Sequence, residues 1–208
     1  MTYTPQVDKK HYDGAAYRSS ERWNSYWHQL DLVRSTKARS ILEIGMGHGA
    51  VARELRAAGF EVKTADIAAD LNPDFVCSIT ELTAPDNSFD VVLAAEILEH
   101  IRFEDVPAAL RQLARVCRTH AVVSIPHPGF VSSIILKLPK LRFSLLLKIP
   151  FFWQSKTATT EHYWELGRPG FSVARFVKEA EAAGLSLVFS KSYADDPAHR
   201  FFVFKKKI

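Results

Sequence analysis

A short apolar segment that runs into three alternating glycines constrains the fold of this chain more than any other feature. Residues 41–44 read as a β-strand, and Gly45, Gly47 and Gly49 precede a helix-like stretch that Gly59 ends. A strand, a tight turn and a helix in this order are typical of nucleotide-binding α/β sheets, because glycines let the backbone approach a ligand at the helix N-terminus. We therefore expect a nucleoside-containing cofactor at this turn.

An acidic residue at the end of the next predicted strand supports this interpretation. Residues 60–65 predict that strand, and Asp66 follows it directly. A carboxylate at this position can accept hydrogen bonds from both hydroxyls of a ribose. We therefore predict that Asp66 binds the ribose of the cofactor.

Glu43 helps to distinguish between two classes of cofactor. The pattern Gly45-x-Gly47-x-x-Ala50 also satisfies the dinucleotide motif, so an NAD-dependent oxidoreductase is the rival interpretation. Glu43 would then lie beside a diphosphate, and like charges about 4 Å apart cost roughly 4 kcal/mol at an effective dielectric near 20. S-adenosyl-L-methionine carries an ammonium and a sulfonium group, so an acid at this turn favours it. A Glu43 that points sideways and is solvated or paired with a lysine would remove this argument.

A second motif lies in residues 86–101, where an apolar strand leads to Glu96 and then to Leu98-Glu99-His100. Together with the Glu43 and glycine motif it resembles class I S-adenosylmethionine-dependent methyltransferases, in particular the small-molecule branch of methyltransferase type 11 and ubiquinone-biosynthesis-like enzymes. The similarity is good over about residues 40–128 and looser over the last forty residues, and it is weak over the first forty residues and over 129–171. It implies a Rossmann-like, doubly wound, seven-stranded and mostly parallel sheet whose last strand is antiparallel.

The resemblance also implies further cofactor contacts. Ile67 and Ile79 would pack on the adenine ring, and Glu96 would lie beneath the methionine part. Ser78 stands where the family often has an aspartate that accepts from the adenine amino group. A hydroxyl can still accept that hydrogen bond, although a neutral acceptor binds more weakly than a charged one.

The rest of the chain alternates between helical and strand patterns, which favours a parallel sheet covered on both faces. Residues 103–118 and the segment between Ser172 and Gly184 predict helices. Strands are expected at 121–125, 185–193 and 201–204. With 208 residues of which 47% are hydrophobic, we expect one domain over residues 1–208, with an N-terminal arm at 1–38 and an inserted lid at about 129–170.

The two cysteines, Cys77 and Cys117, indicate neither a disulfide framework nor a zinc site, so we expect no bound metal. The N-terminus lacks the pattern of a secretory signal, and we expect a cytoplasmic protein. The formal net charge is +4 and the pI is near 9.1. This excess of positive charge is modest, and part of it comes from the terminal Lys205-Lys206-Lys207. Nucleic acid is therefore not the favoured partner, and a small-molecule acceptor is.

Aromatic residues concentrate in the N-terminal arm. Trp23, Trp27, Leu30 and Val33 recur at helical spacing and predict an amphipathic helix whose rings pack on the sheet or close the site. Three residues outside this stripe are the better candidates for ligand contact: Tyr12, Tyr17 and Arg18.

Three histidines are candidates for a general base, which methyl transfer needs only when the acceptor must lose a proton. His100 and His127 follow predicted strands at the edge where parallel sheets bind ligands, and His162 lies in the inserted segment. Each of them can equally be a structural histidine that holds a loop together.

The segment 129–160 carries Lys137, Lys140, Arg142, Lys148 and Lys156, several apolar runs and no acidic residue. It could contact an anionic membrane surface or accept a hydrophobic or anionic substrate. A helical cap with solvated lysines and a dimer contact are the other interpretations. A catalytically silent nucleoside-binding or membrane-associated regulatory protein is the non-enzyme alternative for the whole chain.

Overall fold

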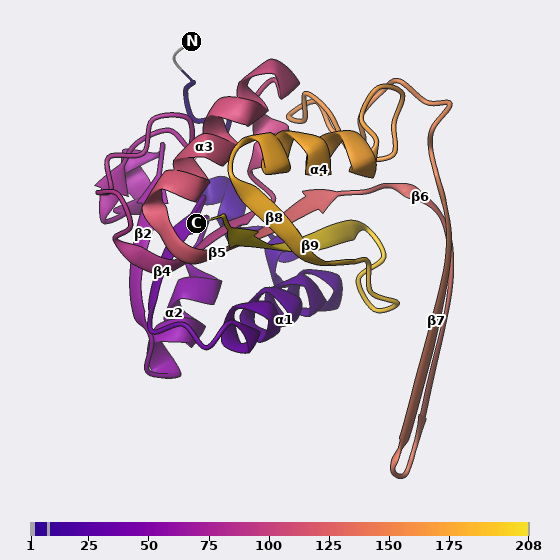
Figure 1. Cartoon of the computed structure of the whole chain (residues 1–208). Helices are drawn as coiled ribbons and strands as arrows, with labels where there is room; N and C mark the ends of the chain where they lie inside the picture. Colours follow the sequence, from indigo (N-terminus) through magenta and orange to yellow (C-terminus); the bar gives the residue numbers. More distant parts are fainter. Residues whose placement is uncertain (1–2, 8, 208) are drawn as a thin grey trace.

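The computed structural model describes residues 3–7 and 9–207. The predicted domain also includes residues 1–2, 8 and 208, which lie outside the described residues. Of these, residues 1–2 and 8 belong to the predicted N-terminal arm. Within the described part, the chain forms a seven-stranded sheet in the order β3-β2-β1-β4-β5-β9-β8 and a separate two-stranded hairpin, β6-β7 (Figure 1).

The strands of the larger sheet are β1 (Ser40–Ile44), β2 (Glu61–Asp66), β3 (Phe75–Val76), β4 (Phe89–Ala95), β5 (Cys117–Pro126), β8 (Leu185–Lys191) and β9 (His199–Lys206). β1 to β5 pair in parallel. β9 lies between β5 and β8 and is antiparallel to both. This arrangement confirms the predicted Rossmann-like sheet with an antiparallel last strand.

Helices cover both faces of this sheet (Figure 1). They are α1 (Ser20–Ser35), α2 (Ala50–Ala57), α3 (Val106–Val116) and α4 (Val173–Ala182). Successive strand residues point to opposite faces. Ile41 accordingly packs with α1 and α2 in one apolar cluster, whereas Leu42 packs with α3 and α4 in the other. Short 3₁₀ helices join these elements: η1 (Lys9–Asp13), η2 (Ala15–Arg18), η3 (Ala69–Leu71), η4 (Leu98–His100) and η5 (Phe103–Asp105).

The buried face of α1 differs from the predicted stripe. Leu30 and Val33 are buried, as the spacing predicted, but Trp23 and Trp27 are 48% and 55% exposed. Neither interpretation of these two rings is therefore supported, because they do not pack on the sheet and neither is among the described residues that line the cavity reported below. The helix instead turns polar residues inward beside its apolar ones, among them Ser25 and Gln29.

The inserted segment begins with β6 (Gly129–Leu138) and β7 (Leu141–Pro150), which form a long hairpin that leaves the body of the molecule (Figure 1). Lys140, with φ +67°, lies in the turn. The helical cap considered from the sequence is thus not the structure that forms. The later part of the insertion, around residues 158–165, lies at the body of the molecule and lines the cavity described below.

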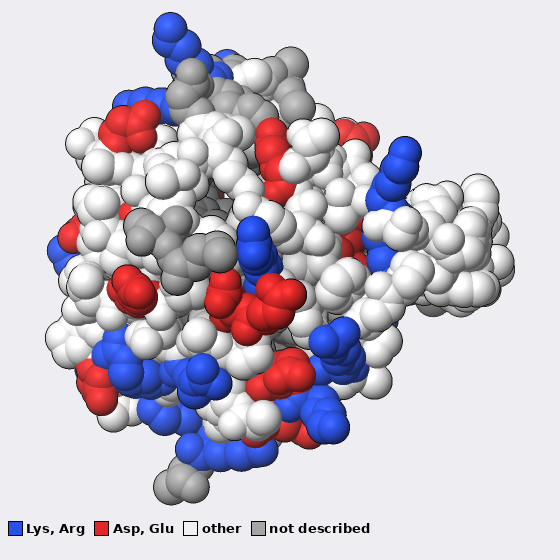
Figure 2. Space-filling model, turned by 90° about the horizontal axis from the view of Figure 1, so that it is seen from above, with Lys and Arg blue, Asp and Glu red and all other residues white. Residues whose placement is uncertain are grey.

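Cross-strand partners lie on the same face of a hairpin, and one face of this hairpin is apolar over nearly its whole length. Its exposed members are Phe130, Ile134, Leu136, Leu138, Leu141, Phe143, Leu145, Leu147 and Ile149. Figure 2 shows charged residues of both signs over the body, whereas the projection on the side of the hairpin is mostly uncharged. None of the helices in the described residues combines the length and the hydropathy that crossing a bilayer requires.

Candidate active site

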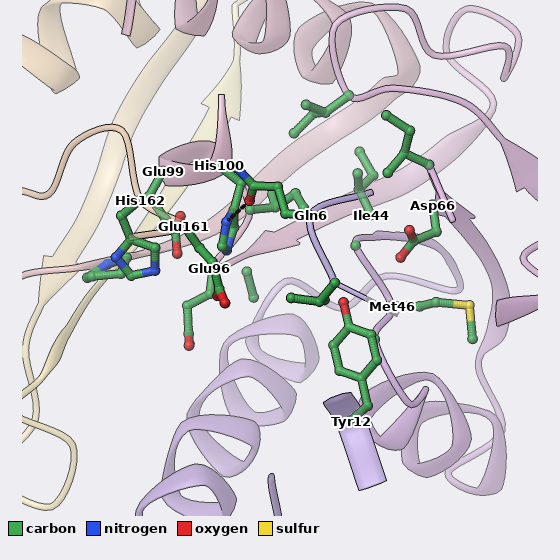
Figure 3. A pocket seen from close by; sticks show the side chains of 18 of the residues that line it. Gln6, Tyr12, Ile44, Met46, Asp66, Glu96, Glu99, His100, Glu161 and His162 are labelled. Atoms are coloured by element: carbon green, nitrogen blue, oxygen red, sulfur yellow. Dashed lines mark hydrogen bonds between the residues drawn. The ribbon is translucent and has the colours of Figure 1, made fainter. Parts of the chain in front are cut away.

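A cavity of about 600 Å³ opens at the carboxyl ends of the parallel strands (Figure 3). Its size is in the range of small-molecule and cofactor sites. Asp66 and Met46 lie at one end of the view, and His100 and His162 lie at the other, with Glu96 nearer to the histidines. The α/β topology places ligands at this edge of a sheet, so the position agrees with the site predicted from the glycine motif.

The glycine turn leaves no room for side chains. Gly45 has φ +73°, and a Cβ atom there would lie 2.8 Å from Cδ1 of Ile97. Gly47 has φ +51°, and its Cβ would lie 3.3 Å from the ring of Tyr12. Gly49 precedes α2 as its N-cap. The turn thus brings bare backbone to the cavity at a helix N-terminus, as a nucleoside cradle requires.

Asp66 ends β2 and lines the cavity, with 8% of its surface exposed. Its Oδ1 accepts a hydrogen bond from the backbone N–H of Ala68 at 2.9 Å. Burial raises the pKa of this carboxyl, while the backbone N–H groups of neighbouring residues, including Met46 and Gly47, act in the opposite direction. The side chain is therefore held beside the glycine turn, where a ribose would lie.

Glu43 lines the same end of the cavity and is only 6% exposed. Its Oε2 has no hydrogen-bond partner within the part of the chain that the structure describes. Burial raises its pKa to about 8, against the backbone N–H of Ala52 and the charges of Arg53 and Arg56, which lower it. The solvated orientation considered from the sequence is not the one found, and the orphaned oxygen fits a cationic ligand.

The predicted adenine residues Ile67, Ser78 and Ile79 all line the cavity. Ile79 is buried, and the Ser78 hydroxyl already forms a hydrogen bond of 2.9 Å with the hydroxyl of Thr80. An adenine amino group would therefore share Ser78 with Thr80.

Glu96 follows β4 with φ +52°, an uncommon conformation for a residue other than glycine. Its carboxylate accepts from Arg22 Nη1 at 2.5 Å and from Ser25 Oγ at 3.0 Å, and it lies 3.2 Å from His199 Nε2. Although burial acts in the opposite direction, the charges of His199 and Arg22 and the Ser25 hydroxyl lower its pKa. The structure thus gives Glu96 an ionic network in addition to its place on the cavity wall.

His199 is the second centre of that network. Its Nδ1 lies 2.7 Å from Asp196 Oδ1 while its Nε2 faces Glu96. Although burial opposes the charged form, Glu96 and Asp196 raise the pKa of His199 to about 10. The imidazole is therefore a fixed cation at neutral pH rather than a base.

The structure brings two of the three candidate bases together. His100 and His162 both line the cavity, with ring centroids 5.1 Å apart. His127 is buried and is not among the described residues that line the cavity. Burial and the charges of Lys148 and Arg200 lower its pKa to about 3. Its placement therefore does not support a catalytic role.

The N-terminal arm contributes part of the cavity wall. Tyr12 and Tyr17 line it, as the sequence predicted, whereas Arg18 is exposed and is not among the described lining residues. Sequence reasoning missed Arg22, Tyr26 and Gln29 of α1, as well as Glu165 and His199. The signal in α1 was the 3–4 residue spacing of its polar residues and Tyr26, which the search for an apolar stripe overlooked.

The comparisons agree with this geometry. A family model for a methyltransferase domain matches residues 17–187. No curated protein sequence matches the chain.

Solved structures of similar fold include the 1,6-didemethyltoxoflavin-N1-methyltransferase of Burkholderia thailandensis with bound 1,6-didemethyltoxoflavin and S-adenosylhomocysteine. Its sequence is 15% identical to this chain, and the TM-score is 0.61. The match covers 100% of this chain and 94% of that one. The magnesium protoporphyrin IX methyltransferase of Synechocystis, with bound SAH, has 15% identity and a TM-score of 0.61, covering 99% and 90%. A TehB-like SAM-dependent methyltransferase from Corynebacterium glutamicum has 16% identity and a TM-score of 0.56, covering 93% and 100%. At these identities the likeness shows the fold.

Proposed function

The chain belongs to the methyltransferase domain family, and from this premise we propose that it transfers the methyl group of S-adenosyl-L-methionine to a small-molecule acceptor. The observation that carries the proposal is a single cavity with a glycine turn and two buried carboxylates at one end and a pair of histidines at the other. The neighbours with bound S-adenosylhomocysteine or SAH support the cofactor.

The residues at the glycine turn fit this cofactor. Asp66 would accept from the ribose hydroxyls, and Ile67 and Ile79 would flank the adenine. Glu43 would receive the ammonium of the methionine part, which supplies the opposite charge that its buried, unpartnered oxygen lacks. A diphosphate would add negative charge beside the same carboxyl, so the arrangement favours S-adenosylmethionine over NAD.

The bound cofactor supplies an electrophilic methyl group on a sulfonium whose leaving group is a neutral thioether, so no residue must activate the leaving group. Most of the rate then comes from positioning the acceptor. Tyr12 and Tyr17 would cover the mouth of the cavity and exclude water. His100 lines the same cavity, where burial and the neighbouring His162 lower its pKa to about 4, so its imidazole is neutral in the free protein.

Calorimetric titration of the purified chain with S-adenosylmethionine, S-adenosylhomocysteine and NAD tests the proposal. Binding of the first two without NAD is the expected result. Binding of NAD alone would move the chain to the oxidoreductases. Cofactor binding without turnover across a broad screen of acceptors would favour the silent nucleoside-binding protein.

We further propose that the β6-β7 hairpin contacts an anionic membrane surface. One face of the hairpin is apolar, and the whole segment 129–160 carries basic residues without any acidic one. Lys137 and Lys140 lie at its tip, while the side chain of Arg142 lies outside the described residues. Anionic lipids complement this charge, whereas a second copy of the segment would repel it.

Co-sedimentation with vesicles tests this contact. The chain is expected to bind vesicles that contain phosphatidylglycerol and to bind much less to pure phosphatidylcholine. Changing Lys137 and Lys140 to Glu should abolish binding to the vesicles. The same change at Lys205 and Lys207, which lie outside the hairpin, should leave the binding intact. Absence of binding by the unchanged protein would remove the proposal.

A further inference from the structure

Three side chains with metal-ligating atoms meet at the histidine end of the cavity. Glu99 and His100 come from η4, and His162 comes from the returning part of the insertion. One ligand atom of each lies within 4.8 Å of the others, and the three residues gather in Figure 3. Ligands of one bound cation, at 2.0–2.2 Å from it, lie within about 4 Å of one another, so small side-chain movements would close the set.

Glu99 is the unusual member of this group. The residue is fully buried, and neither carboxylate oxygen has a hydrogen-bond partner within the described residues. A buried carboxyl with two orphaned oxygens is costly unless a positive ligand binds there.

The two histidines are oriented as metal ligands are. Nδ1 of His162 lies 2.8 Å from Oε1 of Glu165, and Nδ1 of His100 lies 2.7 Å from Oε1 of Gln6. The Glu165 carboxylate fixes the His162 ring and leaves its Nε2 for a metal, as in carboxylate–histidine–zinc arrangements, while Gln6 fixes the His100 ring. The backbone carbonyl of Glu161 accepts a hydrogen bond from the His100 ring, and a cation bound at that nitrogen would replace this bond.

The surrounding structure holds the two segments in register. The backbone N–H of Tyr163 donates to the carbonyl of Glu99 at 2.9 Å. The indole of Trp164, which is 1% exposed, donates to the carbonyls of Leu98 and Ile101 at 3.1 and 3.2 Å. Segments far apart in the sequence are thus tied together around the three side chains.

From these contacts we propose that Glu99, His100 and His162 form a binding site for a divalent cation of the zinc type. Two histidines and one glutamate are a ligand set of catalytic zinc, which keeps a further position open. Since the group lies in the same cavity as the glycine turn, that open position would take an oxygen of the acceptor, such as a hydroxyl or a carboxylate. This last step rests on the proposed function, whereas metal binding itself does not.

The test is titration of the full chain, stripped of metal with a chelator, with ZnCl₂ by calorimetry and with CoCl₂ by visible absorption. We expect one equivalent of each metal to bind, with Co²⁺ giving the absorption of a site of low coordination number. His162→Ala and Glu99→Gln should weaken binding by roughly tenfold or more. His120→Ala, which changes a histidine outside the cavity lining, should leave it unchanged.

Circular dichroism and thermal unfolding establish whether each variant is folded. If His162→Ala does not fold, Glu99→Gln still provides the test, because it preserves the shape of the side chain. Absence of stoichiometric binding by the unchanged protein would overturn the proposal, as would equal affinity in folded variants. Titration of the same samples with S-adenosylmethionine separates the two proposals. Cofactor binding without metal binding rejects only the metal site, whereas metal binding without cofactor binding rejects only the proposed function.

Discussion

The two ends of the cavity are built in different ways. The cofactor end comes largely from one strand–turn–helix unit and the strand beside it, with Glu43, the glycine turn and Asp66 within a short stretch of chain. The histidine end brings together η4, the residues after β7 and the start of β9. A local unit leaves a readable motif in the sequence, whereas a site gathered from distant segments depends on how they pack.

The largest effect is expected in the ionic network at the histidine end. Replacing His199 with Gln leaves the buried Glu96 with fewer positive partners, and we expect a loss of about 3 kcal/mol in the free energy of unfolding. Denaturant titration measures it. His120→Gln, the same change at a histidine of β5 outside this network, is the control, and a loss confined to cofactor binding would contradict the prediction.

The same network predicts a pH dependence of stability. His199 has a folded-state pKa of about 10, above the ordinary value of 6.5, so its contribution is complete below pH 6.5 and is lost as the pH rises through 10. The unfolding midpoint of the unchanged protein should therefore fall between pH 7 and 10 more steeply than that of His199→Gln. Parallel curves for the two proteins would show that His199 is not charged in the fold.

At the cofactor end, the expected loss is in binding rather than in folding. Asp66→Ala removes charge-assisted hydrogen bonds to the ribose. One bond of this kind is worth about 1.5–3 kcal/mol, so affinity for S-adenosylmethionine should fall at least roughly tenfold and by about 150-fold or more if both bonds contribute. Calorimetry measures the change. Asp70→Ala, an exposed acid shortly after it, should bind normally. Equal affinity in both variants would reject the ribose assignment.

A smaller effect is expected from the ionisation of Glu43. With a pKa of about 8, this carboxyl is protonated at pH 6–7 in the free protein, while a cationic ligand favours the ionised form. Affinity for S-adenosylmethionine should therefore rise with pH between 6 and 8, by up to about tenfold per unit. Glu43→Gln should flatten this dependence, and a slope that persists in that variant would assign it to another group.

The smallest effect is expected from the hairpin, which belongs to neither end of the cavity. Replacing residues 132–147 with Asn-Gly keeps the pair Val131 and Lys148 as the end of a shorter hairpin. Affinity for S-adenosylmethionine should stay within about twofold, because distant and independent sites contribute additively. A large loss would show that the hairpin supports the cavity.

Much of the fold follows from sequence patterns that depend on neighbours along the chain. The strand–glycine–helix unit at 41–59, Asp66 at the end of β2 and the helix after Ser172 all form where the periodicity and capping residues predict them. The tryptophans of α1 mark the limit of this approach. Trp23 and Trp27 match an apolar stripe, yet the helix rotates so that Arg22 and Ser25 reach Glu96.

The sequence by itself determined the sheet, the glycine turn and the acids of the cofactor end, since steric limits at glycine and the two-residue period of strands act within a few residues. Only the tertiary structure decided that His100 and His162 line the same cavity and that His127 is not among its described lining residues. It also decided that the basic insertion begins as a hairpin. Burial and pairing over long separations control those outcomes. They depend on the shape of the whole molecule rather than on spacing along the chain.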